Sequence, residues 1–361
     1  MEKEKTLDLI GELSNAKGAP GFEDEVVNLI RQYGDGLGEW NEDSMRNLCL
    51  HRHSRKEGLP TLMLDAHTDE VGFMIRAIRS DGTLDFIPLG EWVASNVSAH
   101  RVLVRNDHGK WLPGIVASKP PHYLSAEEQK LAPEISKMVI DVGATSKKEV
   151  LEDYHISMGT PVVPDVSFEY NQDRDLMIGK AFDDRLGCAA IISVLRELDG
   201  KTFPFNIAGS FAVQEEVGYR GAIVTAQTIK PDIAITFEGC PADDTLTSGS
   251  QSHLIQTALK KGPMLRHIDG GMITNHRFQR FALDIADKKG IPVQEAVRIG
   301  SYTNGAAIHT TGKAVPVIVI GVPVRYSHTH YGIASFSDYE NSVKLACEVI
   351  RGLGEKGIGE F

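Results

Sequence analysis

Apolar residues recur along this chain at spacings that predict two helices and then a buried strand. Over 7–13 and again over 22–30 they return every three or four positions, which is typical of helices that pack one face on a core. TLMLDA at 61–66 is a short apolar run that leads directly into the polar segment HTDE. A buried strand that feeds a functional loop has this pattern. We therefore expect chemistry to begin where this strand ends.

The pattern changes between Val71 and about Pro164, where short alternating or apolar runs are separated by Gly, Pro, Asn and Asp. These runs predict a small β module, which we expect to form a barrel. After it, helical and strand patterns alternate: a helix at 185–198 and strands at 206–213, 232–237 and 315–322. Alternating strands and helices predict an α/β sandwich. The predicted organisation is one discontinuous α/β domain, 1–70 and 165–361, with a β domain inserted at 71–164.

Composition indicates a folded protein of about two domains. Of 361 residues, 42% are hydrophobic and 24% charged, which is ordinary for globular chains. The 38 Lys+Arg and 49 Asp+Glu residues give a net charge of -11, which disfavours binding to nucleic acid or an anionic membrane. We find neither an apolar signal-peptide core near the N-terminus nor an apolar run of membrane-spanning length. The four cysteines are far apart and form no CxxC pair, so we expect a cytoplasmic protein.

Polar side chains that could carry chemistry follow the predicted strands. In an open α/β sheet, ligands bind at the carboxyl ends of the strands. We expect seven residues from five segments to converge there: His67, Asp69, Asp183, Glu215, Glu216, Glu238 and His328.

The two imidazoles and several carboxylates, without thiolates, suit zinc, cobalt or manganese held by nitrogen and oxygen. Three carboxylates and two neutral histidines around two divalent ions leave a charge of +1, which a bridging hydroxide would neutralise. A dinuclear hydrolytic site is therefore predicted. Neighbours in extended chain point in opposite directions, so Glu215 and Glu216 can do different jobs. The same pair would also suit a helix N-terminus, which favours negative charge.

Five motifs, taken together and in order, resemble the M42 family of metallo-aminopeptidases, which includes glutamyl and tetrahedral TET-type aminopeptidases. They are LDAHTDEVGF (64–73), GKAFDDRLGC (179–188), VQEEVGYRGA (213–222), the region of Glu238, and PVRYSH (323–328). KPPH at 119–122 and DVGA at 141–144 extend the resemblance over nearly the whole chain. It implies a mixed-sheet α/β sandwich of the zinc-exopeptidase type, with a small β-barrel-like domain that serves dimerisation or assembly.

The resemblance also implies a role for each site residue. His67 and Glu238 would bind one metal, Glu216 and His328 the other, and Asp183 would bridge the two. The implied cofactors are two divalent ions per subunit, zinc first, with cobalt or manganese as alternatives.

Two further residues complete the implied machinery. Glu215 would be the general base, taking a proton from the bridging water and delivering it to the leaving amine. Asp69 would accept the other ring N–H of His67 and fix its tautomer. The Asp183–Asp184 peptide bond is expected to be cis.

The function that follows is a co-catalytic dinuclear-metal aminopeptidase acting on short peptides. The alternatives are a metal-dependent N-acyl amidohydrolase or deblocking enzyme and, less favoured, a glycosidase, which would need two carboxyl groups roughly 5–9.5 Å apart and no metal. A binding or assembly protein without activity is disfavoured. The expected partners are short peptides and copies of the same chain, in a dimer-based homo-oligomer up to a tetrahedral dodecamer.

Two positions depart from the family pattern. Many members carry Asp where this chain has Glu238, and a Thr-Asp pair where it has Thr303 and Asn304. These departures bear on substrate preference more than on the type of reaction. The remaining candidates are assigned structural roles: His330 beside His328, the isolated His100, His122 and His309, and the small buried thiols Cys188 and Cys240. His330 is alternatively a pocket residue, and His122 is also a candidate to line the site.

Overall fold

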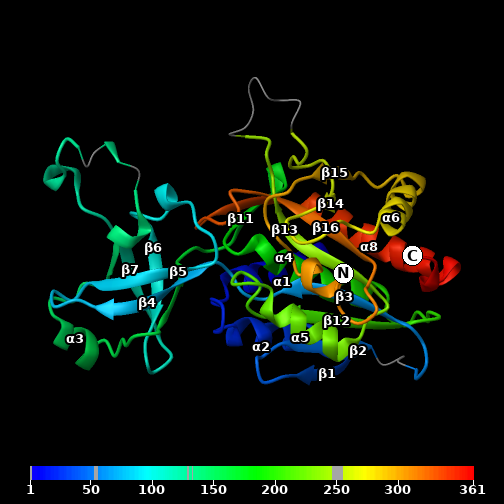
Figure 1. Cartoon of the computed structure of the whole chain (residues 1–361), viewed down its shortest axis with the longest axis horizontal. Helices are drawn as coiled ribbons and strands as arrows, with labels where there is room; N and C mark the ends of the chain where they lie inside the picture. Colours follow the sequence, from blue (N-terminus) through cyan, green and yellow to red (C-terminus); the bar gives the residue numbers. More distant parts are fainter. Residues whose placement is uncertain (1, 53–55, 128–129, 132, 246–254) are drawn as a thin grey trace.

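A mixed β-sheet forms the centre of the larger of two bodies in the computed structural model (Figure 1). The model describes residues 2–52, 56–127, 130–131, 133–245 and 255–361. The sheet has eleven strands, in the order β1-β2-β12-β3-β13-β16-β17-β11-β10, with β14 paired to β16 and β15 paired to β14. Their bounds are β1 Gly38–Glu42, β2 Leu48–Arg52, β3 Thr61–His67, β10 Glu169–Asn171, β11 Leu176–Gly179, β12 Asn206–Ala212, β13 Ile233–Pro241, β14 Met264–Ile268, β15 Gln294–Val297, β16 Val317–Arg325 and β17 Gly332–Ser335.

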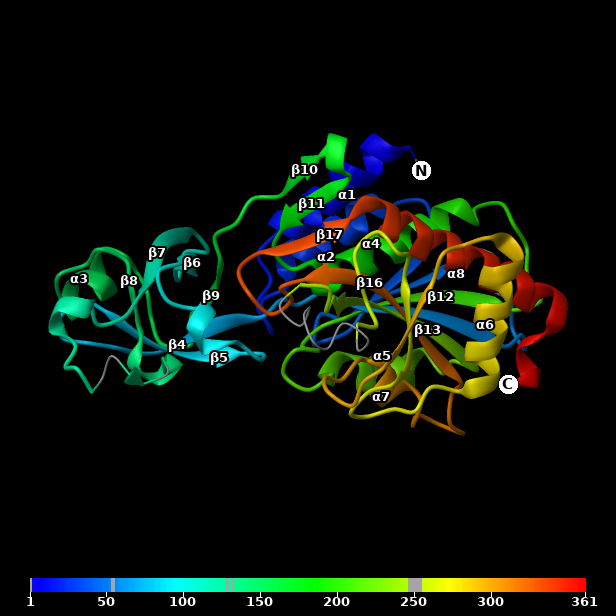
Figure 2. The same cartoon turned by 90° about the horizontal axis from the view of Figure 1, so that it is seen from above.

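Four central strands, β12, β3, β13 and β16, run parallel to one another. Their residues are almost entirely buried, because helices cover both faces of the sheet. On one face lie α1, α2, α4, α6 and α8; on the other lie α5 and α7 (Figure 2). The helices are α1 Lys3–Asn15, α2 Asp24–Tyr33, α4 Phe182–Glu197, α5 Arg220–Ile229, α6 His276–Lys289, α7 Gly305–Ile308 and α8 Phe336–Lys356. No helix within the described ranges is both long and apolar enough to cross a membrane.

The second body is a closed six-stranded barrel, which lies to one side of the larger body (Figure 1). Its strands follow the order β4-β5-β8-β7-β6-β9, and α3, Lys147–Glu152, packs against them. The strands are β4 Gly72–Ile78, β5 Leu84–Leu89, β6 Arg101–Arg105, β7 Trp111–Ala117, β8 Val139–Asp141 and β9 Pro161–Pro164. Short 3₁₀ helices are η1 Ala94–Asn96, η2 Pro121–Tyr123, η4 Ile135–Lys137, η5 Gln172–Arg174 and η7 Ile358–Glu360. The barrel has an apolar core of its own, in which inward-facing residues alternate with exposed ones.

The structure confirms the predicted fold class, a mixed α/β body with a small β barrel. Sequence patterns did not predict the short outer strands of the sheet, most of which pair antiparallel. These strands, β1, β2, β10, β11, β14, β15 and β17, are three to five residues long, too short for a clear alternation.

Candidate metal centre

The parallel strands bring five predicted residues to one edge of the sheet. His67 is the last residue of β3, and Glu215 and Glu216 follow Val213 and Gln214 after the end of β12, the neighbouring strand. His328 follows β16. Glu238 was expected at the end of its strand, but β13 continues to Pro241, so Glu238 lies within it. Parallel neighbours end at the same edge, and their terminal side chains therefore meet.

One cluster of ligating atoms surrounds the ring of His67, whose side chain is 2% exposed. Its Nε2 atom lies 3.3 Å from Oδ1 of Asp183, 3.6 Å from Oε2 of Glu238 and 4.0 Å from Oε2 of Glu215. Three carboxylates from three different elements thus face a single imidazole nitrogen.

A second cluster surrounds His328. Its Nε2 atom lies 3.5 Å from Oδ2 of Asp183 and 3.7 Å from Oε2 of Glu216. The other ring nitrogen, Nδ1, lies 3.0 Å from the backbone carbonyl of Glu91. That carbonyl can only accept, so Nδ1 carries a hydrogen, and in the neutral ring Nε2 has the lone pair that can bind a metal ion.

Asp183 joins the two clusters, because its two carboxylate oxygens face different histidines. It lies in the first turn of α4, and Ser327 donates a hydrogen bond of 3.0 Å to Oδ2. The Asp183–Asp184 peptide bond is cis, as the resemblance predicts. Gly239 lets the strands close on this turn, since a Cβ atom there would come within 2.5 Å of the Asp183 backbone. The strand, the glycine and the helix start thus place one carboxylate between two imidazoles.

The donor set fits two divalent ions. Ligand atoms of His67, Asp184 and Glu238 lie within 4.8 Å of one another, and so do those of Asp183, Glu216 and His328. Oε2 of Glu238 is buried without a hydrogen bond, and it is therefore available to bind a metal ion. Asp184 was not predicted, and its carboxylate already accepts the backbone N–H groups of His67 and Gly187. Nitrogen and oxygen donors in this mixture suit zinc and similar ions.

Burial and crowding set the protonation of these groups. Burial raises the pKa of Glu238 well above its usual range, and the charges of Asp183 and Asp184 raise it further. Burial also raises the pKa of Glu215, and it raises that of Glu216 to about 7. Burial alone would lower the pKa of His67, but hydrogen bonds to neighbouring carboxylates outweigh it and raise the pKa. Cations at this buried edge would stabilise the charged forms of these carboxylates.

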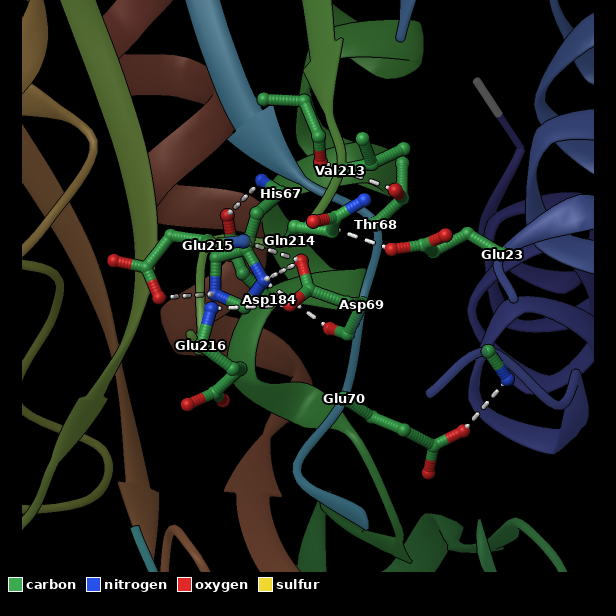
Figure 3. A network of polar contacts seen from close by, with 12 residues as sticks. Glu23, His67, Thr68, Asp69, Glu70, Asp184, Val213, Gln214, Glu215 and Glu216 are labelled. Atoms are coloured by element: carbon green, nitrogen blue, oxygen red, sulfur yellow. Dashed lines mark hydrogen bonds and ion pairs between the residues drawn. The ribbon is translucent and has the colours of Figure 1, made fainter. Parts of the chain in front are cut away.

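Asp69 ties the ligand segments together (Figure 3). Its Oδ1 and Oδ2 atoms accept the backbone N–H groups of Glu215 at 2.9 Å and Glu216 at 3.0 Å. Nδ1 of His67 lies 3.1 Å from the Asp69 backbone carbonyl and 3.4 Å from Oδ1. The expected contact with the ring is therefore made chiefly by the backbone, while the carboxylate orients the two glutamates. Glu23, which the sequence did not single out, accepts the N–H of Gln214, and burial beside Asp69 raises its pKa to about 8.

A buried ion-pair network supports the loop after β3. Nζ of Lys180 lies 2.6 Å from Oε1 of Glu70, and both side chains are 2% exposed. Arg185 reaches the same oxygen at 3.3 Å and donates to the backbone carbonyl of Thr68. Burial lowers the pKa of Lys180 to about 8. The network fastens the loop that follows His67 to the start of α4, which carries Asp183.

Replacing Lys180 by Met is expected to lower the free energy of unfolding by about 3–5 kcal/mol, because it leaves Glu70 buried with a single, longer ion pair. Urea unfolding of the metal-free protein measures this loss. The double variant Lys180→Met/Glu70→Gln, which removes both charges, should lose less than the single one. Equal losses in the two variants would show that packing, not charge, stabilises this loop.

The clusters open into a cavity of about 340 Å³. His67, Asp183, Glu215, Glu216, Glu238 and His328 line it together with Glu91, Gly218, Tyr219, Gly239, Pro241, Arg266, Ser301 and Tyr302. Arg266 is 3% exposed, and it donates to Ser301 Oγ at 3.0 Å and to Cys240 Sγ at 3.4 Å. Sequence patterns gave no signal for Arg266, Tyr219 or Tyr302, because single polar or aromatic residues at strand and loop positions are common.

The other histidines and cysteines lie outside the ligand clusters. His330 is buried and stacks on His100, with ring centroids 4.1 Å apart. His309 contacts the Gly305 carbonyl, and His122 lies in η2 on the barrel, outside the lining of the cavity. Cys188 donates to the backbone carbonyl of His67 at 3.1 Å, and all four cysteines are buried and unpaired.

Known protein families, sequences and structures match this chain over most of its length. The model of the M42 glutamyl aminopeptidase family matches residues 47–345. A glutamyl aminopeptidase of Lactococcus lactis is 30% identical over 98% of both chains. The crystal structure of a TET aminopeptidase from a marine sediment thaumarchaeon superposes with a TM-score of 0.94 at 35% identity, covering 99% of this chain and 98% of the other.

A third comparison concerns assembly. The TET1 peptidase of Pyrococcus horikoshii, described as able to assemble into a tetrahedron or a large octahedral shell, superposes with a TM-score of 0.84. It is 26% identical, and the match covers 96% of this chain and 99% of that one.

Proposed function

The chain belongs to the M42 glutamyl aminopeptidase family and is therefore a peptide hydrolase, and we propose that it is a co-catalytic, two-metal aminopeptidase acting on short peptides. One observation carries this proposal: the oxygens of Asp183 face His67 at 3.3 Å and His328 at 3.5 Å. A carboxylate shared between two imidazoles can bridge a pair of divalent ions that each bind one of the histidines.

The proposed ligands are His67 and Glu238 on one side, Glu216 and His328 on the other, and Asp183 between them. When bound, two divalent ions make water nucleophilic at neutral pH and polarise a carbonyl oxygen. Zinc is the first candidate, with cobalt and manganese next, since all three accept nitrogen and oxygen donors.

Glu215 is the proposed general base. Its carboxylate is 10% exposed, lines the cavity, and reaches to 4.0 Å from Nε2 of His67. Burial raises the pKa of Glu215 well above its usual range, which favours proton uptake by this carboxylate. In this scheme Glu215 accepts a proton from the attacking water and donates it to the leaving amine. The carboxylate-rich edge of the cavity would attract the free α-amine of the substrate.

Replacing Asp69 by Asn is expected to lower kcat about 10- to 100-fold while the fold is retained. The amide keeps one acceptor, but its NH₂ group would face a backbone N–H of the Glu215–Glu216 segment. Steady-state kinetics on an aminoacyl substrate measure the loss, with Asp199→Asn, an exposed position, as the control. Unchanged kinetics in Asp69→Asn would show that the orientation of this segment does not depend on the carboxylate.

A panel of aminoacyl chromogenic substrates beside their N-acetylated twins tests the proposed reaction. Activity is measured after chelation and after adding back zinc, cobalt or manganese. Metal-restored cleavage confined to free amines is the expected result, and the panel would also identify the preferred first residue. Cleavage of the acetylated set alone would indicate a deblocking enzyme or deacylase, and cleavage that resists chelation would contradict a metal mechanism.

The proposal also covers the cellular location and the oligomeric state of the protein. The four buried, unpaired cysteines support a reducing, cytoplasmic location. The likeness to TET peptidases supports a homo-oligomer, with the barrel as the proposed assembly domain and a dodecamer as its expected form. Light scattering coupled to gel filtration distinguishes a dodecamer from a dimer.

A further inference from the structure

The barrel domain completes one side of the proposed metal centre. Residues 90–92 directly follow the barrel strand β5, and Glu91 lines the catalytic cavity. A smaller pocket contains Val71 and Pro164, at the two ends of the barrel, together with Asp183, Glu216 and His328. The cluster around His328 therefore lies where the barrel joins the larger body.

Two contacts tie residues 90–92 to the ligands of this cluster. The backbone carbonyl of Glu91 lies 3.0 Å from Nδ1 of His328. Gly90 packs against Glu216, because a Cβ atom at Gly90 would lie 3.1 Å from Oε2 of Glu216 and 2.7 Å from Cγ1 of Val71. The backbone of Gly90 is also left-handed, with φ at +83°, which glycine adopts at little cost. A glycine is therefore needed for the chain to approach Glu216 so closely.

The turn that carries His328 needs support from outside. Tyr326 and His328 both have left-handed backbone, with φ at +62° and +59°. This conformation is unfavourable for residues other than glycine and persists only where the surroundings hold it. The side chain of His328 is 31% exposed, so packing around the ring is limited. The Glu91 carbonyl fixes the direction of the ring that this turn presents to the metal site.

An aromatic stack holds residues 90–92 in place. The ring of Trp92 stacks on Phe73, a fully buried residue of the barrel core, with centroids 4.6 Å apart, and its Nε1 donates to the Gly72 carbonyl at 3.1 Å. On its other side Trp92 contacts His330 at 5.1 Å between centroids, and His330 stacks on His100 of the barrel. Trp92 thus connects the barrel core to the turn that contains the second histidine ligand.

The two ligand clusters differ in how they are supported. His67 ends β3 and Glu238 lies within β13, two central strands of the sheet, whereas Glu216 and His328 lie in loops that meet the barrel. We propose that residues 90–92 position Glu216 and His328 and thereby set the affinity of the enzyme for the second of its two metal ions. This inference rests on the proposed two-metal function. It makes the barrel a part of the active site, in addition to its proposed role in assembly.

Calorimetric titration of the metal-free, full-length protein with cobalt(II) tests the proposal. The wild type should bind two ions per subunit. Trp92→Ala and Gly90→Ala should bind one ion about 10- to 100-fold more weakly and retain the other, because residues that orient metal ligands contribute to affinity by this factor. Trp92→Phe, which keeps an aromatic ring beside His330, should lose less than Trp92→Ala. A general destabilisation of the fold would not weaken one ion selectively.

The barrel offers a matched control for each variant. Trp111 in β7 also links the barrel to the larger body, because its Nε1 donates to Oε1 of Glu25 at 2.8 Å. Gly109 has φ at +77°, and a Cβ atom there would have space, since it would lie 3.8 Å from Nη2 of Arg105. Trp111→Ala and Gly109→Ala should both bind two ions with wild-type affinity.

Anomalous diffraction at the cobalt edge, from Trp92→Ala crystals at limiting cobalt, identifies the weakened ion. We expect reduced occupancy beside Glu216 and His328 and full occupancy beside His67 and Glu238. Wild-type affinity for both ions in Trp92→Ala and Gly90→Ala, weakening of both ions alike, or the same selective loss in Trp111→Ala would overturn the proposal and leave the two-metal function intact. A wild type that binds fewer than two ions would contradict the two-metal function and this inference with it.

Discussion

Glu215→Gln should reduce kcat by about 10²–10⁴-fold and leave the metal content of the enzyme unchanged. The amide keeps the size of the side chain and its place in the cavity, but it cannot take a proton from water. The clusters around His67 and His328 keep their other ligand atoms in this variant. Kinetics on the preferred free-amine substrate and elemental analysis of the same preparation measure both quantities.

Glu169→Gln is the matched control, because Glu169 is exposed on β10, at the edge of the sheet. It should have wild-type activity. A Glu215→Gln enzyme with more than a tenth of wild-type kcat would refute the role of Glu215 as base. Loss of both metal and activity would instead identify Glu215 as a metal ligand. Its distance of 4.0 Å from Nε2 of His67 is compatible with that role.

Asp183→Asn should abolish detectable activity and lower the metal content below one ion per subunit. Within the described part of the chain, only this carboxylate lies within 4 Å of both His67 and His328, at 3.3 Å and 3.5 Å. An amide has one oxygen and no charge, so it cannot neutralise or bridge two cations. Because each cluster contributes to metal binding separately, His328→Ala should be milder and lose one ion only.

Asp173→Asn, at an exposed position in η5, is the control for the loss of an aspartate and should bind two ions. Circular dichroism of each variant separates metal loss from unfolding. If Asp183→Asn retained two ions with the wild-type affinity, the bridging role would be wrong, and Asp184 in the first cluster would become the candidate.

The sequence predicted most of what lies on the central strands. TLMLDA followed by HTDE identified β3 and the ligands after it, because a parallel strand buried on both faces is apolar along its whole length. Motif order then connected Glu215, Glu216 and His328, which are far apart in the chain. Strand pairing brings them together, and the order of β12, β3, β13 and β16 in the sheet is a property of the fold that no local pattern contains.

Other features depended on long-range contacts and could not be predicted. The carboxylate of Asp69 holds the backbone of the Glu215–Glu216 segment, a contact between two loops that leaves no periodic signal. Arg266 enters the cavity from β14, a strand of five residues.

The central claim is that two divalent ions share Asp183. Anomalous diffraction at the zinc absorption edge, from crystals of the zinc-loaded, active enzyme, tests it most directly. We predict two peaks on either side of Asp183, one beside His67 and Glu238 and the other beside Glu216 and His328. A single peak, or none, in crystals of an enzyme that cleaves free-amine substrates would contradict the two-metal account.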